Sequence, residues 1–260
     1  MDLKLKNKVI IVTGGTKGIG EAISREVANE GAVPVFIGRN KENGALLLND
    51  LKKQHKEAHY IQANLNDTKS CKKAVKEVIK KYGRIDGLVN NAGKNDSIGL
   101  ESGSPETFSK SISNNLNHYY DMAHFCLDAL KKTKGSIINI SSKTAITGQG
   151  GTSGYAAAKG AQLALTREWA VELLKYEIRV NAVIPAEVMT PLYENWLNSF
   201  SNPKEKLNAI VEKIPLGKRM TTKEEIASMV LFLLSEKANH ITGQHLFVDG
   251  GYTHLDRGLS

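Results

Sequence analysis

Short apolar runs alternate along the chain with longer segments in which apolar residues recur every three or four positions. The runs are rich in β-branched residues, as in "KVIIVTG" at 8–14, which is typical of buried parallel strands. The longer segments have the spacing of amphipathic helices. The predicted strands cover residues 8–14, 33–38, 58–64, 84–93, 135–142, 178–185 and 243–251. The predicted helices cover residues 20–31, 42–54, 68–83, 105–113, 114–130, 153–175 and 223–235.

This order of elements predicts the fold class. Repeated strand–helix–strand units with short turns indicate an α/β protein with a doubly wound parallel sheet and helices on both faces. No linker or repeat divides the chain, so we expect one domain over residues 1–260, with a polar, Asn-rich insertion near residues 188–215. Ligands of such sheets bind outside the carboxyl ends of the strands.

Composition narrows the function classes. The chain has 260 residues, no apolar stretch long enough to span a membrane and no signal peptide. Cys71 and Cys126 have neither disulfide nor metal-site spacing, which favours a reducing cytoplasm. The net charge is +8, but the lysines are scattered along helical segments without a recognition motif. Solvated helix faces explain this charge better than a nucleic-acid partner.

A glycine-rich loop, "TGGTKGIG" at 13–20, joins the first strand to the first helix. Gly14 allows a tight turn out of the strand, Gly18 a close approach of the backbone to a pyrophosphate, and Gly20 close packing of helix on strand. The helix N-terminus then offers free N–H groups to phosphate. An ordinary glycine-rich loop is the alternative, but the first strand–helix turn is where a dinucleotide-binding loop belongs.

Tyr155 and Lys159 lie four residues apart near the start of a helix and therefore share one face. By itself this spacing is typical of a Tyr ring lying along a Lys stem on a helix surface. A nearby cation also lowers the pKa of a tyrosine, which is ordinarily about 10, and so makes it a usable base. Ser142 ends the fifth strand and could hold a reacting oxygen near Tyr155.

Taken together, these motifs resemble those of the short-chain dehydrogenase/reductase family. They are the G-x-x-x-G-x-G loop, "NNAG" at 90–93, "YAAAK" at 155–159 and a Ser thirteen residues before the Tyr. The resemblance covers essentially the whole chain. It implies a seven-stranded Rossmann-like sheet, a nicotinamide dinucleotide cofactor, a small-molecule substrate and a homotetramer.

The resemblance also implies catalytic roles. Ser142, Tyr155 and Lys159 match three catalytic residues of the family, and Asn115 matches the fourth. In the family this Asn kinks its helix and holds a water in a proton relay to the Lys. Asn114 is the alternative match, although Asn115 directly before Leu116 fits better. Besides Tyr155 and Lys159, the implied cofactor contacts are Gly14, Thr16, Lys17, Gly18, Ile19, Gly20, Arg39, Asn64, Leu65, Asn91, Ala92, Gly93, Pro185, Val188 and Thr190.

The end of the second strand predicts which cofactor is preferred. A carboxylate there would bind the ribose hydroxyls of NAD and repel a 2′-phosphate. This chain instead has Gly38 followed by Arg39, and Lys17 lies in the glycine loop. Two cations and no anion favour NADP. If Arg39 only stacks on the adenine and Lys17 is solvated, NAD would also be used.

Longer stretches at 139–173, 181–196 and 247–257 are similar to bacterial L-fucose dehydrogenases within that family. The similarity implies oxidation of the anomeric hydroxyl of L-fucose, L-galactose or D-arabinose to a lactone. The predicted substrate contacts are Asn95, Ser142, Lys143, Gln149, Tyr155, Glu187 and Trp196. Lys143 and Glu187 could instead pair with each other, or with the tail of the chain, for structure alone. The tail at 253–260 could reach a neighbouring subunit's site.

Two rival functions remain open at this point. One is an NADPH-dependent carbonyl or 3-oxoacyl reductase of the same family, which a strongly apolar substrate loop would favour. The other is a binding module that senses the NADPH/NADP ratio, against which the intact set of Ser142, Tyr155 and Lys159 argues. No metal is expected at the site.

Overall fold

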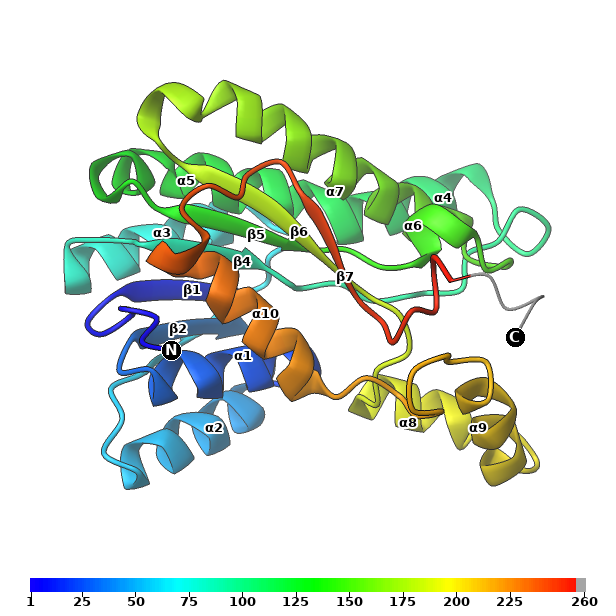
Figure 1. Cartoon of the computed structure of the whole chain (residues 1–260). Helices are drawn as coiled ribbons and strands as arrows, with labels where there is room; N and C mark the ends of the chain where they lie inside the picture. The colour runs from blue at the N-terminus through cyan, green and yellow to red at the C-terminus, as the bar shows by residue number, and fades with distance from the viewer. Residues whose placement is uncertain (256–260) are drawn as a thin grey trace.

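Seven parallel strands form a single sheet in the computed structural model, which describes residues 1–255 (Figure 1). Their order across the sheet is β3-β2-β1-β4-β5-β6-β7, and every neighbouring pair is parallel. The strands are β1 (Val9–Thr13), β2 (Val33–Gly38), β3 (His59–Gln62), β4 (Gly87–Asn90), β5 (Ser136–Ile140), β6 (Arg179–Pro185) and β7 (His245–Val248). The predicted doubly wound α/β fold is confirmed.

Helices cover both faces of this sheet. The α-helices are α1 (Gly18–Asn29), α2 (Lys41–Lys53), α3 (Thr68–Tyr82), α4 (Pro105–Ile112), α5 (His118–Thr133), α6 (Thr144–Thr147), α7 (Ser153–Glu172), α8 (Pro191–Leu197), α9 (Pro203–Val211) and α10 (Lys223–Leu234). Apolar residues of α1, α2 and α10 pack on one face, and those of α3, α5 and α7 on the other (Figure 1).

The two-sided burial explains the continuous apolar runs of the strands. In β1, Val9 and Ile11 pack toward α3 and α5, whereas Ile10 and Val12 pack toward α1 and α10. Successive side chains of a strand point to opposite faces, so a strand covered on both sides needs apolar residues at every position.

The helix pair predicted at 105–113 and 114–130 is joined without a break. A π-helical turn, Ser113–Asn117, connects α4 directly to α5. Such turns are rare and frequently lie at functional sites. This one contains Asn115, which is 1% exposed.

The polar insertion contains two short helices that the pattern of apolar residues did not indicate. Thr190 and Asn202 cap them, each accepting a hydrogen bond from a backbone N–H three residues on, and a Pro follows each cap. This combination of a capping residue and Pro is a helix-start signal in the sequence. Figure 1 shows α8 and α9 beyond the carboxyl ends of the strands.

The first backbone amide of β1 is satisfied by a carboxylate. Asp86, directly before β4, accepts a hydrogen bond from Val9 N at 2.9 Å and two from the Arg84 guanidinium, at 2.8 and 2.6 Å. Asp86 is only 7% exposed. The carboxylate therefore ties the starts of the two central strands together.

We expect Asp86→Ala to lower the free energy of unfolding by about 2 kcal/mol, because it leaves a buried N–H without a partner. Chemical denaturation followed by circular dichroism measures the change. Asp128→Ala, an exposed position on α5, is the matched control and should alter stability by less than about 0.5 kcal/mol. Equal losses in the two variants would contradict the assigned role of Asp86.

Candidate active site

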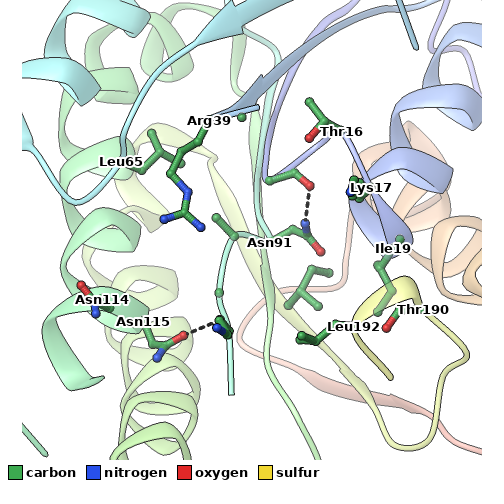
Figure 2. Close-up of a pocket in the computed structure, with 18 of the residues that line it drawn as sticks. Thr16, Lys17, Ile19, Arg39, Leu65, Asn91, Asn114, Asn115, Thr190 and Leu192 are labelled. Atoms are coloured by element: carbon green, nitrogen blue, oxygen red, sulfur yellow. Dashed lines mark hydrogen bonds between the residues drawn. The ribbon is translucent and has the colours of Figure 1, made fainter. Parts of the chain in front are cut away.

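A cleft of about 840 Å³ opens at the carboxyl ends of the central strands. Every residue predicted to contact the cofactor lines this cleft, and so do Ser142, Tyr155, Lys159 and Asn115. Figure 2 shows Arg39 entering from the end of β2, Lys17 and Ile19 from the glycine loop, and Thr190 and Leu192 from the start of α8. The fold thus gathers into one cleft residues that are up to 179 positions apart, from Gly14 to Tyr193.

The glycine loop depends on one backbone conformation and one close contact that side chains would prevent. Gly14 has a φ of +63°, a conformation that L side chains rarely adopt. A Cβ on Gly20 would lie 2.3 Å from the carbonyl oxygen of Gly14. The Asn91 amide donates to the carbonyls of Thr13 and Gly14, at 2.9 and 3.3 Å, and so ties the loop to the end of β4 (Figure 2).

The N-terminus of α1 is free to receive an anion. Its N-cap residue, Lys17, makes no side-chain capping hydrogen bond. The first N–H groups of a helix lack intrahelical partners, and with the helix dipole they attract phosphate. The glycine turn, the uncapped helix and the cleft therefore fit the pyrophosphate of a dinucleotide.

The adenosine end of the cleft is basic and leaves no room for an acid at the end of β2. A Cβ at Gly38 would lie 2.8 and 2.9 Å from the Cγ2 and Oγ1 atoms of Thr16. An acidic side chain at this position would have to displace Thr16. The exposed Arg39 follows immediately and lines the cleft together with Lys17.

Tyr155 lies at the start of α7 and is half-buried against Ser142, to which it is hydrogen-bonded. Burial raises the pKa of Tyr155 to about 12, and the hydrogen bond with Ser142 opposes that rise. Ser142 is held in turn by Thr144, whose Oγ1 donates to the Ser142 hydroxyl at 3.1 Å. The pair places a proton acceptor and a hydrogen-bond donor side by side.

Lys159 lies one turn further along α7 and is 3% exposed. Its ammonium donates to the Ile140 carbonyl at 2.7 Å and lies 5.5 Å from the centroid of the Tyr155 ring. Burial lowers the pKa of Lys159 to about 7. Burial is the largest cause of the pKa shift of both side chains, and the effect of Lys159 on the pKa of Tyr155 stays a prediction.

Asn115 and Asn114, the two candidates for the fourth catalytic position, differ in their surroundings. Asn115 is buried, accepts a hydrogen bond from Lys94 N at 2.8 Å and donates to the Ser111 carbonyl at 3.0 Å. Asn114 also lines the cleft, but its side chain accepts a hydrogen bond from exposed Asn66. The geometry favours Asn115, and its catalytic role remains a prediction.

Several residues predicted as substrate contacts lie outside the set that lines the cleft, and their role stays a prediction. Lys143 and Glu187 pair with each other, the alternative left open above, with side-chain exposures of 9% and 11%. They do not line the cleft, and neither do Asn95, Gln149 and Trp196. Gln149 is exposed, Asn95 accepts a hydrogen bond from Ser97 N, and Trp196 packs edge-on against Tyr193 and Phe200. The charged groups satisfy each other because two strand ends bring them together.

Polar residues that were not among the predicted substrate contacts line the cleft. Lys94, Asp96 and Tyr193 line the cleft, and Tyr193 donates to Glu187 at 2.6 Å. His118 also lines it, with a pKa lowered to about 4 by burial. The place of Lys94 and Asp96 directly after the "NNAG" turn is a signal in the sequence for a position at the cleft, whereas no motif pointed to Tyr193.

The described residues 1–255 contain no cluster of His, Cys, Asp or Glu that could hold a metal ion. Within that same range, no helix has both the length and the apolar content needed to cross a membrane. Residues 256–260 lie outside the description, so the expectation that the tail completes a neighbouring subunit's site stays a prediction.

The fold and the cleft define a dinucleotide-binding oxidoreductase. Residues 14–253 match the family described as enoyl-(acyl carrier protein) reductase. The chain belongs to the short-chain dehydrogenase/reductase family, as its motifs predicted.

Individual relatives agree with this assignment. The chain is 35% identical to 3-oxoacyl-[acyl-carrier-protein] reductase FabG of Thermotoga maritima, covering 96% of this chain and 99% of that one. It is 34% identical to the L-fucose dehydrogenase of Mus musculus, covering 95% and 89%. Among solved structures, the Cj0485 dehydrogenase is 52% identical and superimposes with a TM-score of 0.94, covering 100% and 99%.

We expect Gly20→Ala to weaken NADPH binding by at least about tenfold, because its Cβ would push the Gly14 carbonyl and reshape the phosphate loop. Titration of NADPH fluorescence measures the affinity. Gly160→Ala on α7, whose Cβ would meet nothing within 4 Å, is the control and should bind as the wild type does. Unchanged affinity in Gly20→Ala would refute the loop's role in binding.

Proposed function

We propose that this chain oxidises the anomeric hydroxyl of L-fucose, or of the related L-galactose and D-arabinose, to the lactone with NADP as oxidant. The observation that carries the redox part is the cluster of Ser142, Tyr155 and Lys159 at the strand ends, within the cleft that the glycine loop also lines. When bound there, the nicotinamide supplies the acceptor for a hydride.

In this proposal Ser142 holds the reacting oxygen and Tyr155 takes its proton. The C1–H bond breaks as hydride leaves, the O–H bond breaks as Tyr155 accepts the proton, and a carbonyl forms at C1. The ammonium of Lys159 favours the anionic form of Tyr155 that the first step needs. Asn115 supports the turn from which Lys94 and the cleft wall extend.

A polar substrate suits the end of the cleft next to Tyr155. Lys94, Asp96 and Tyr193 line the cleft with charged and hydroxyl groups, which suit a hydroxylated ligand better than an acyl chain. The similarity to the L-fucose dehydrogenase of mouse also supports a sugar substrate. The predicted homotetramer and cytoplasmic location are retained as part of the proposal.

A 3-oxoacyl reductase is the second candidate, because the FabG relative is as similar to this chain as the L-fucose dehydrogenase is. Its substrate would carry a long flexible thioester, and its direction would be reduction with NADPH. The two candidates share the catalytic cluster, so only turnover of defined substrates separates them.

We expect absorbance of reduced nicotinamide to rise when the protein is mixed with NADP and L-fucose, L-galactose or D-arabinose, and to stay flat with L-rhamnose and D-glucose. Tyr155→Phe should lose activity by a factor of about 10² or more while NADPH still binds, because the proton acceptor is removed. Turnover of acetoacetyl-thioester with NADPH, and of no sugar, would replace the sugar proposal with the reductase.

We expect Arg39→Asp to lower the NADP/NAD ratio of kcat/KM by about tenfold or more, because a charge-assisted bond to the 2′-phosphate becomes a repulsion. Steady-state rates with each cofactor give the ratio. Lys41→Asp makes the same charge change on an exposed residue outside the cleft and should leave the ratio within about twofold. A ratio that moves equally in both variants would show that Arg39 does not select the cofactor.

A further inference from the structure

Gln162 lies one turn beyond Lys159 on α7, with its side chain entirely buried at 0% exposure. A buried primary amide is costly unless both its donor and its acceptor are satisfied. Thr166, one turn further, donates to the Gln162 carbonyl at 2.8 Å, and the Asn139 amide donates to Thr166 at 3.0 Å. The backbone that carries Gln162 is thereby anchored to β5.

The Gln162 amide is one of three acceptor sites around the ammonium of Lys159. Lys159 Nζ donates to the Ile140 carbonyl at 2.7 Å, to Gln162 Oε1 at 3.2 Å and to the Tyr119 hydroxyl at 3.3 Å. An ammonium has three N–H donors, so these acceptors match its capacity. They come from β5, α7 and α5.

The other end of the same amide reaches the π-helical turn. Gln162 Nε2 donates to the main-chain carbonyl of Asn115 at 2.8 Å. The Asn115 side chain is itself engaged with Lys94 N and the Ser111 carbonyl. Gln162 therefore joins Asn115 to Lys159. Its orientation is set chemically, because an ammonium only donates and a carbonyl only accepts.

We propose that Gln162 is a positioning residue that bridges Asn115 and Lys159 and takes the two hydrogen bonds that a relay water between them would make. This inference rests on the proposed hydride-transfer role of Tyr155 and Lys159, but not on the identity of the substrate. A primary amide keeps its N–H protons at neutral pH, so the bridge orients Lys159 without passing protons along.

Crystal structures of the protein alone and with NADP test the bridge without any turnover. We expect Gln162 within hydrogen-bond distance of both Asn115 O and Lys159 Nζ in each crystal structure. A water between those two atoms, with the Gln162 amide turned away, would overturn the proposal even if the sugar assay succeeds. If the sugar assay fails and the bridge is present, the proposed function fails and the bridge stands.

The pH dependence of kcat distinguishes positioning from a structural role. Gln162→Met keeps the length of the side chain but removes an acceptor from Lys159, so its charged form is less stable and the alkaline limb should move about one unit to lower pH. Gln162→Glu adds a negative charge beside Lys159, so the same limb should move to higher pH. We expect kcat of Gln162→Met to fall by at least about tenfold.

Gln244→Met, at an exposed position, is the matched control and should leave both kcat and the limb unchanged. Thermal unfolding and NADPH titration verify that each variant is folded and binds cofactor. Alkaline limbs that coincide in the wild type, Gln162→Met and Gln162→Glu, whatever the loss of kcat, would show that Gln162 only packs the interior.

Discussion

The site depends on keeping an ammonium group out of water. Lys159 is buried, and an unpaired charge in such a place would be expelled or neutralised. Three acceptors offset part of this cost, one from a strand end and two from helices that the sheet holds in place. The position of β5, α5 and α7 relative to one another is therefore part of the chemistry, since moving any of them would remove an acceptor from the charge.

At the other end of the cleft the constraint is steric, because backbone segments approach each other closely at glycines. Gly14 and Gly20 let the loop and helix α1 meet at distances that no side chain would allow, and Gly38 leaves space for Thr16. The absence of side chains at these positions exposes backbone N–H groups to a phosphate. At Gly38 it also removes the position from which an acid would select against a 2′-phosphate, and the proposed preference for NADP rests partly on this.

Between these ends, two residues of opposite charge are paired with each other. Lys143 and Glu187 satisfy each other behind the cleft, with Tyr193 bonded to the carboxylate and the Tyr252 ring 4.0 Å from the ammonium. The pair joins the segments that follow β5 and β6. Lys94, Asp96 and Tyr193, in contrast to this pair, line the cleft itself.

Much of this could be predicted from the chain alone because it is encoded locally. Strand and helix periodicity, the spacing of Gly14, Gly18 and Gly20, and the i, i+4 pair of Tyr155 and Lys159 all depend on neighbouring residues. Even the missed helices α8 and α9 carried local cap-and-proline signals. The ion-pair and hydrogen-bond partners of buried polar residues are different, because they lie far apart in the sequence. Lys143 meets Glu187 across 44 positions and Gln162 meets Asn115 across 47, and nothing in either segment specifies the distance to the other. Those pairings arise when the sheet sets its strand order, because a buried polar group then bonds to whatever partner the packing brings within reach.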